Sequence, residues 1–141
     1  MWSLKSESRL QKWKRFREDI SKMPLEQALQ ATSDFWHEAP FTPYYLDNEN
    51  PNNWPDAWTL IHENYYCDVA KSLGIIYTLM FSEHGNGLLP ELRVYYDPTK
   101  RYFYNLAWFN DGKYILNMYD ESVVNIEQLN KELELKHKYT A

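Results

Sequence analysis

The hydrophobic positions near the start of the chain recur at helical spacing. Residues 3–20 carry one apolar stripe and polar residues on the other faces, which predicts an amphipathic helix. Pro24 suits the first position of a second helix, which must end before Pro40 because the residue preceding a proline avoids helical geometry. Pro55 opens a third, short helix that runs to about Glu63. The stripe of the first helix consists of Leu10, Trp13, Phe16 and Ile20.

The segment that follows, residues 65–81, is apolar on nearly every side. A helix with this pattern belongs in the middle of a domain, so we expect it to be the central, buried helix. Asn64 is placed to cap its N-terminus, and Gly85-Asn86-Gly87 ends it. Gly74 costs about 1 kcal/mol relative to alanine inside a helix. We therefore expect it to allow the close approach of another element.

Beyond residue 90 the hydrophobic period changes from helical to alternating. Residues 102–109 and 113–119 are β-branched or aromatic runs around Asn110-Asp111-Gly112, which predicts a hairpin. An alternating segment around Val94 precedes the hairpin, and Val123–Val124 is a candidate for a further strand. The sheet is therefore predicted to be an antiparallel meander of three to four strands.

The end of the chain adds a short helix near residues 126–133, where Asn125 and Gln128 are placed as a capping box. The tail through Lys138 is expected either to fray or to add an edge strand. The predicted fold class is α+β, with N-terminal helices and a central buried helix packed on the C-terminal antiparallel sheet. The single predicted domain, 1–141, divides into a helical part (1–85), the meander (90–125) and a short C-terminal helix with a tail (126–141).

Composition narrows the setting of this domain. Its 141 residues include 6 Trp, 12 Tyr and 6 Phe, side chains that bury a large area each. Cys67 is the only cysteine, so no internal disulfide can form and a reducing compartment is indicated. Residues 1–10 lack the apolar run of a signal peptide, and no stretch reaches the roughly 20 apolar residues of a membrane helix. We expect a cytoplasmic protein without membrane contact. Its overall style resembles small proteins of large tailed phages, which would place it in the host cytoplasm.

Charge is unevenly distributed along the chain. The net charge of −5 disfavours general nucleic-acid binding through phosphate neutralisation. Residues 5–22 are basic, whereas residues 23–70 contain no Lys or Arg and eight acidic residues. Two alternatives remain open. The oppositely charged faces help these segments dock on each other, or the acidic stretch forms a patch for a basic protein partner.

A long connection, residues 41–53, joins the second and third helices. Its prolines and asparagines exclude regular structure, but its aromatic residues are anchors, so we expect it to be pinned against the core. Two tryptophans bracket the proline that follows, and such residues commonly anchor interfaces. The candidate partner-binding residues are Tyr44, Tyr45, Trp54, Trp58, Asp47, Glu49 and Asp56.

Cys67 is the strongest candidate for chemistry. It falls near the start of the central helix, where the helix macrodipole stabilises a thiolate. A reactive cysteine also needs a base within hydrogen-bond reach. No metal or cofactor is expected, because clustered Cys and His are absent and Gly85-Asn86-Gly87 is not followed by the Gly-Lys of a phosphate loop.

Two segments around this cysteine carry a resemblance. The helix start, Tyr66-Cys67-Asp68-Val69-Ala70, and the hairpin, residues 104–114, resemble the core of the transglutaminase-like branch of the papain-like fold. The resemblance implies that Cys67 is the nucleophile, that a catalytic histidine begins the first hairpin strand, and that a catalytic aspartate lies close to Asp120.

The histidine position departs from this pattern. It falls on Tyr104 or Asn105, and neither side chain can act as the base, since an amide does not shuttle protons. A three-residue loop would place Asn105 opposite Asn117, and His62 or His84 could fold back towards Cys67.

Two functional hypotheses follow. The first is a non-catalytic interaction or assembly module that docks a protein partner through the acidic aromatic residues of the long connection. The alternative is a cysteine-dependent acyl-transfer enzyme, transglutaminase-like or protease-like, that uses Cys67 with Asp120. Whether the chain forms an oligomer is open.

Overall fold

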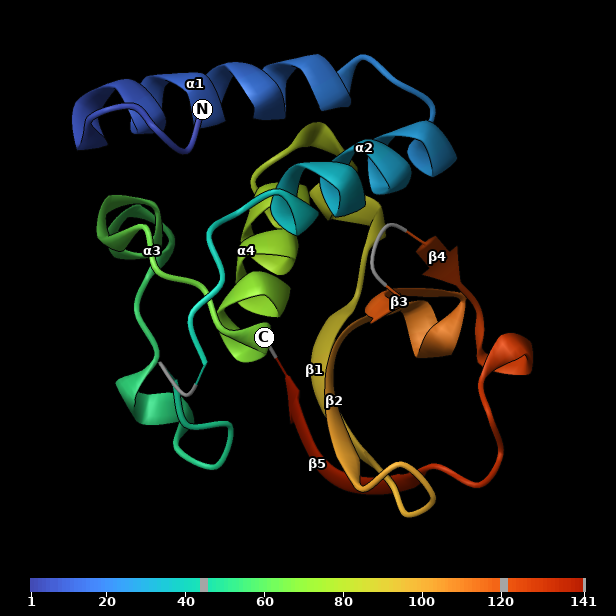
Figure 1. Ribbon diagram of the computed structural model, residues 1–141. Coiled ribbons are helices and arrows are strands. Elements are labelled where there is room, and N and C mark those ends of the chain that lie inside the picture. Colours follow the sequence, from blue (N-terminus) through green and yellow to red (C-terminus); the bar gives the residue numbers. More distant parts are fainter. Residues whose placement is uncertain (44–45, 120–121, 141) are drawn as a thin grey trace.

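The computed structural model describes residues 1–43, 46–119 and 122–140. Helices occupy the first part of the described chain, and an antiparallel sheet of five strands follows them, which confirms the α+β class (Figure 1). The helices are α1 (Ser6–Ser21), α2 (Leu25–His37), α3 (Ala57–Glu63) and α4 (Asp68–Met80). The strands are β1 (Pro90–Asp97), β2 (Tyr102–Phe109), β3 (Tyr114–Tyr119), β4 (Ser122–Val124) and β5 (Glu134–Thr140).

The strand order in the sheet is β4-β3-β2-β1-β5. β1 pairs with β2 along its whole length, from Pro90 opposite Phe109 to Asp97 opposite Tyr102. The other edge of β1 pairs with β5, so the tail is an edge strand rather than frayed. The sheet therefore has five strands, one or two more than the three to four predicted. Ahead of β5, the expected short helix is a single 3₁₀ turn, Ile126–Gln128, with the predicted capping box formed.

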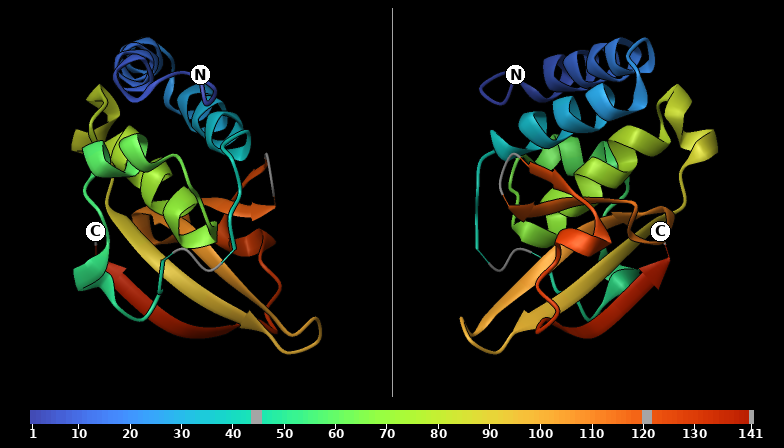
Figure 2. Two further views of the ribbon diagram at one scale, coloured as in Figure 1. Left: turned by 60° about the vertical axis from the view of Figure 1, so that its left-hand side comes forward. Right: turned by 90° about the vertical axis from the view of Figure 1, so that its right-hand side faces the viewer.

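The helices cover one face of the sheet in two layers. Figure 2 shows α4 lying against the strands and α1 farthest from them, while α2 packs on α4 and also reaches β4. The stripe of α1 is directed inward, since Trp13 and Ile20 are fully buried. No helix in the described part of the chain is long and apolar enough to cross a membrane.

The prediction that the apolar helix is central is confirmed. Leu73, Ile76 and Leu79 of α4 are almost completely buried. A Cβ atom at Gly74 would lie 2.4 Å from ring atoms of Trp36 on α2, closer than such atoms come in proteins. The glycine is therefore required because a large indole ring crosses the helix at this point.

The start of α4 differs from the prediction. Asn64 does not cap this helix; it ends α3 in the left-handed conformation, with φ 60° and ψ 32°. Asparagine favours both helix N-caps and left-handed C-terminal positions, and here the second preference prevails. A short extended stretch then leads to Cys67, which is the residue immediately before α4.

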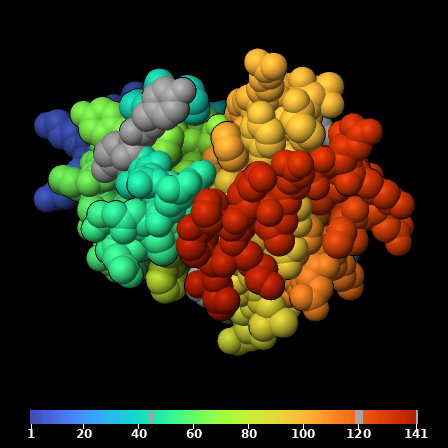
Figure 3. Space-filling view, turned by 90° about the horizontal axis from the view of Figure 1, so that it is seen from below, coloured from blue at the N-terminus to red at the C-terminus, as the bar shows by residue number. Residues whose placement is uncertain are grey.

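The long connection is held in place, as predicted. Backbone hydrogen bonds join Pro40 and Thr42 to Tyr66, just before α4. Farther along, the Trp54 ring meets the Tyr139 ring edge-on, with 5.2 Å between centroids. Figure 3 shows this connection lying beside β5 on the lower face of the molecule.

Candidate active site

Cys67 occupies the N-cap position of α4. Its backbone is extended there, with φ −81° and ψ 179°, and its side chain caps no backbone N–H of the helix. The Sγ atom instead accepts a hydrogen bond from the backbone N–H of Leu46 at 3.3 Å. The partial positive charge of a helix N-terminus and this N–H both favour negative charge on sulfur.

A pocket of about 380 Å³ opens beside Cys67 between the long connection, α4 and β2. The cysteine itself is only 4% exposed. The other residues that line this pocket are Phe41, Pro43, Leu46, Asn48, Asp68, Val69, Arg101, Tyr102, Phe103 and Asn105.

Asn105, which stands at a position where the family resemblance implies a histidine, lines this pocket. It lies on β2, is 8% exposed, and accepts at Oδ1 a hydrogen bond from Nδ2 of Asn48 at 3.2 Å. Its own Nδ2 donates to none of the described residues. The structure therefore presents an amide to the cysteine at the position where the family resemblance implies an imidazole.

Asn117 on β3 is the residue that fixes this arrangement. Its Nδ2 lies 3.1 Å from the backbone oxygen of Asp68, 2.9 Å from Oγ of Ser72 and 3.0 Å from the backbone oxygen of Asn105. Ser72 also donates to the same Asn105 oxygen at 2.5 Å. The amide thus ties the first two turns of α4 to the hairpin.

The geometry of Asn117 depends on a break in the strand alternation. The residue has φ 70°, and the register with β4 shifts between Ile115 and Tyr119. Leu116 belongs to the core on the helical side of the sheet, whereas Ile115 and Met118 both belong to the cluster on the opposite side. Two consecutive side chains, Leu116 and Asn117, consequently face α4, as expected at a β-bulge.

The sequence predicts Asn105 opposite Asn117 in the hairpin, but the observed register of β2 and β3 differs by one residue. Ala107 pairs with Leu116 and Phe109 with Tyr114, so the register is shifted by one residue from that of a three-residue loop. The bulge compensates for this shift, because it turns Asn117 back to the face that carries Asn105.

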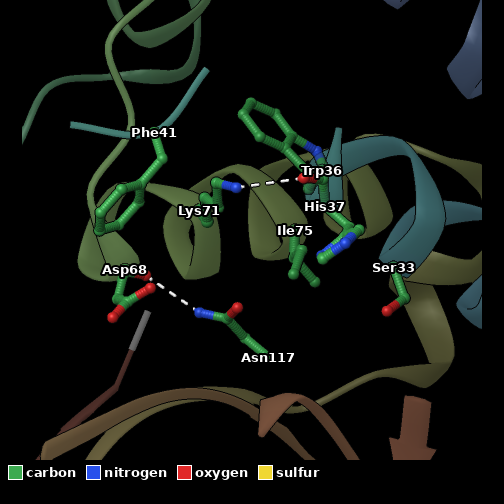
Figure 4. Close-up of a pocket in the computed structure, with 8 residues that line it drawn as sticks. All are labelled: Ser33, Trp36, His37, Phe41, Asp68, Lys71, Ile75 and Asn117. Carbon is green, nitrogen blue, oxygen red and sulfur yellow. Dashed lines mark hydrogen bonds between the residues drawn. The ribbon is translucent and has the colours of Figure 1, made fainter. Parts of the chain in front are cut away.

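A second pocket, of about 250 Å³, lies on the other side of the first turn of α4 (Figure 4). Phe41 and Asp68 line both pockets, and Asn117 reaches this one from the sheet. Lys71 donates from Nζ to the backbone oxygen of His37 at 3.2 Å and so joins α4 to the end of α2. The start of α4 is therefore hollowed on two sides.

No histidine lines the pocket that Cys67 lines, although all four histidines are among the described residues. His62 shares a hydrogen bond with Ser6, and His84 lies 2.9 Å from the backbone oxygen of Ile20. Neither lines the cysteine pocket, so the prediction that one of them folds back towards Cys67 is not met. His137 lies 3.5 Å from Glu49, and His37 lines the second pocket.

Of the two aspartates considered for the site, only Asp68 lies among the described residues. Asp120, the aspartate implied by the resemblance, lies outside the described residues. Asp68 lines both pockets and accepts a hydrogen bond from the Tyr102 hydroxyl at 3.0 Å. The described residues hold no group of three or more His, Cys, Asp or Glu side chains that could bind a metal ion.

The candidate partner-binding residues are mostly engaged in local contacts. The Trp54 indole donates to the backbone oxygen of Asp47 at 2.8 Å, and Asp47 accepts from the Glu49 backbone at 2.8 Å. Trp58 points elsewhere, stacking on Phe81 with 5.8 Å between centroids. Tyr44 and Tyr45 lie outside the described residues.

Asp56 has a structural role at the start of α3. Its side chain accepts a hydrogen bond from the backbone N–H of Thr59 at 2.8 Å, which is an N-cap. Hydrogen bonds from the Thr59 backbone and side chain lower the pKa of this carboxyl below its usual value.

Sequence reasoning missed three contributors to the site. These are the Leu46 N–H on the sulfur, Asn48 on the amide of Asn105, and Ser72 on the hairpin backbone. Only Ser72 left a usable signal: it is a polar residue five positions after Cys67, in a helix that is otherwise apolar on that side.

A cysteine at the start of a buried helix, facing the first strand of an antiparallel hairpin, is the arrangement implied by the transglutaminase-like branch of the papain-like fold. Comparison with solved structures agrees. The chain is similar to LapG of Legionella pneumophila, with a TM-score of 0.73, 12% identity, and coverage of 96% of this chain and 76% of LapG. No family model and no curated protein sequence matches the chain.

Two further LapG structures give the same result. Calcium-bound LapG matches with a TM-score of 0.76 and 11% identity, covering 99% of this chain and 78% of LapG. EGTA-treated LapG matches with a TM-score of 0.70 and 11% identity, covering 96% and 77%. LapG is a transglutaminase-like cysteine protease, so the resemblance seen in the sequence is confirmed at the level of the fold.

The same finding corrects the first functional hypothesis. A non-catalytic module that docks a partner through residues 40–58 is contradicted, because all three similar structures belong to a cysteine-protease-like enzyme. The absence of a histidine from the hairpin leaves Cys67 in place at the start of the buried helix.

Proposed function

We propose that this protein is a cysteine-dependent acyl-transfer enzyme, transglutaminase-like or protease-like, in which Cys67 is the nucleophile. The observation that carries the proposal is the position of Sγ. It lies at the N-terminus of a 13-residue helix, accepts the Leu46 N–H at 3.3 Å, and belongs to a residue that lines a pocket of about 380 Å³. The first two features favour negative charge on sulfur, and the pocket gives a substrate a route to this residue.

The proposed site differs from the one that the family resemblance implies, because it lacks the catalytic histidine of the hairpin strand. Asn105 stands where the imidazole would be, so the proposed enzyme works without a histidine at that position. Asp120 remains a proposed acidic group, and Asn117 is the residue found beside Asn105 on the hairpin.

Alkylation of Cys67 tests the proposal directly. Folded wild-type protein is treated with iodoacetamide at neutral pH, and the rate is measured by intact mass and compared with that of glutathione. We expect Cys67 to react faster than the free thiol, because the helix N-terminus and the Leu46 N–H favour its thiolate. The Cys67→Ser variant is the control and should take up no label. A thiol that reacts only after denaturation would overturn the proposal.

A further inference from the structure

The polar groups that line the pocket of Cys67 point to a particular class of acyl donor. Asn105 is 92% buried, since its exposed fraction is 8%, and it lines the same pocket as the cysteine. Asn48 occupies its oxygen, and its Nδ2 donates to none of the described residues. A nearly buried amide N–H₂ beside a nucleophile is a ready donor for a substrate oxygen, but it cannot accept a proton and return it.

The second amide of the site provides no proton shuttle either. Asn117 directs its Nδ2 to acceptors on Asp68, Ser72 and Asn105, which commits it to holding α4 against the hairpin. The carboxylate of Asp68 accepts from the Tyr102 hydroxyl. The other charged residue of the lining is Arg101, whose guanidinium group has hydrogen-bond donors and no acceptor.

An amide donor without an imidazole favours substrates whose leaving group needs no added proton. Cleaving an amide requires that its nitrogen be protonated as it departs, which is the task of a general acid. Cleaving a thioester does not, because the sulfur departs as a thiolate. A site with a cysteine nucleophile, an amide donor and no imidazole among its described lining residues is therefore matched to a thioester.

We propose, resting on the function proposed above, that the acyl donor of this site is a thioester and that Asn105 Nδ2 donates a hydrogen bond to its carbonyl oxygen. The Cys67 thiolate attacks the carbonyl carbon and forms a new carbon–sulfur bond. The carbon–sulfur bond of the donor breaks, and its electron pair leaves on the donor sulfur. That sulfur takes up from solvent the proton that Cys67 released, so the products are acyl-Cys67 and a free thiol.

The lining of the pocket indicates the kind of acyl group. Six of its residues are apolar or aromatic: Phe41, Pro43, Leu46, Val69, Tyr102 and Phe103. Ligand pockets in proteins combine such walls with a few placed polar groups. An apolar acyl chain fits this lining.

The experiment compares two donors that share one acyl group. N-acetyl-leucine is supplied as its S-benzyl thioester and as its N-benzyl amide, and acyl-Cys67 is measured by intact mass alongside release of the leaving group. We expect the wild type to form the adduct from the thioester and none from the amide. Asn105→Ala should acylate about 100-fold more slowly, the size of effect seen when one donor to a developing oxyanion is removed.

Asn105→His supplies the missing proton shuttle. It should gain cleavage of the amide by about 100-fold or more over the wild type, within the range that general acid–base catalysis contributes. Cys67→Ser is the control for adduct formation. Cleavage of the amide by the wild type would overturn the inference, and so would equal acylation rates in the wild type and Asn105→Ala.

The two proposals can fail separately. If iodoacetamide labels folded Cys67 rapidly but no adduct forms from the thioester, the thioester inference falls and the cysteine-dependent function stands. If neither reagent modifies the folded protein, the proposed function falls and the inference falls with it.

Discussion

The two ends of α4 differ in how completely their polar groups are satisfied. Towards its C-terminal end, the Thr78 hydroxyl accepts hydrogen bonds from the indole N–H groups of Trp13 and Trp36, each at 2.9 Å, and donates to the Gly74 backbone at 2.6 Å. At the N-terminal end, Asn105 leaves an N–H₂ group without a partner among the described residues, beside a pocket. We call the C-terminal end closed, because the polar groups around Thr78 all have hydrogen-bond partners. We call the N-terminal end open, because Asn105 has an N–H₂ group that a substrate could bind.

This difference separates stability from chemistry within one helix. Buried polar networks add rigidity when every member has a partner, and they are costly when one member does not. The closed end joins α1 and α2 to the central helix through Thr78. The open end instead retains groups that a substrate can satisfy, and binding and catalytic sites tolerate such local cost.

The largest effect is expected from breaking the closed end. Thr78→Val keeps the shape of the side chain but leaves two fully buried indole donors, on Trp13 and Trp36, without an acceptor. Each unsatisfied buried donor costs about 1–3 kcal/mol, so the free energy of unfolding should fall by about 3 kcal/mol in urea titrations. Thr78→Ser retains the hydroxyl and should cost only about 1 kcal/mol for the lost methyl. Equal stability of the two variants would show that the network contributes little.

At the open end, a serine in place of Cys67 is expected to give a smaller change in the free energy of unfolding, and one that stabilises the helix relative to alanine. Serine is a preferred N-cap and cysteine is not, and position 67 already has the extended N-cap backbone. Cys67→Ser should therefore raise the free energy of unfolding by about 0.5–1 kcal/mol relative to Cys67→Ala, while both variants lose alkylation. Urea titrations of the two variants check this. A serine variant no more stable than the alanine variant would show that a hydroxyl at position 67 does not cap α4.

The same contrast explains what the sequence could predict. The sequence predicts α1 because burial of one face imposes a helical period on its apolar residues, and α4 because its segment is apolar on nearly every side. The strand β5 remained one of two options for the tail, because its residues are largely exposed and carry little apolar signal. Asn64 was assigned to the wrong helix because asparagine serves at both kinds of helix end.

The site was predictable only in part. Cys67 and Asn105 could be singled out from their positions in the helix start and the hairpin, and both line one pocket. The contact of Asn117 depends on a bulge at φ 70°, and a period-two pattern cannot display a break of this kind. The Leu46 N–H belongs to an irregular connection, whose backbone direction no residue pattern specifies.

An effect of similar size is expected at Tyr66, which packs against Trp36 of α2. It directly precedes Cys67, its ring meets Trp36 edge-on at 5.1 Å between centroids, and its hydroxyl donates to the Leu60 backbone at 2.8 Å. Burial raises the pKa of this hydroxyl above its usual value. Because the folded state favours the neutral phenol, the contribution of Tyr66 is complete below about pH 10, the usual tyrosine pKa, and is lost as the pH rises through the folded pKa.

Replacing the hydroxyl isolates this contribution. Tyr66→Phe should lower the free energy of unfolding by about 1 kcal/mol at neutral pH, the typical net value of one hydrogen bond. Above about pH 10 the gap between the wild type and the variant should narrow, because only the wild type then has a buried phenol to ionise. Tyr65→Phe, at the exposed neighbouring tyrosine, is the matched control and should leave the alkaline loss intact. Parallel curves for the wild type and Tyr66→Phe up to pH 11 would mean that burial does not raise the pKa of this hydroxyl.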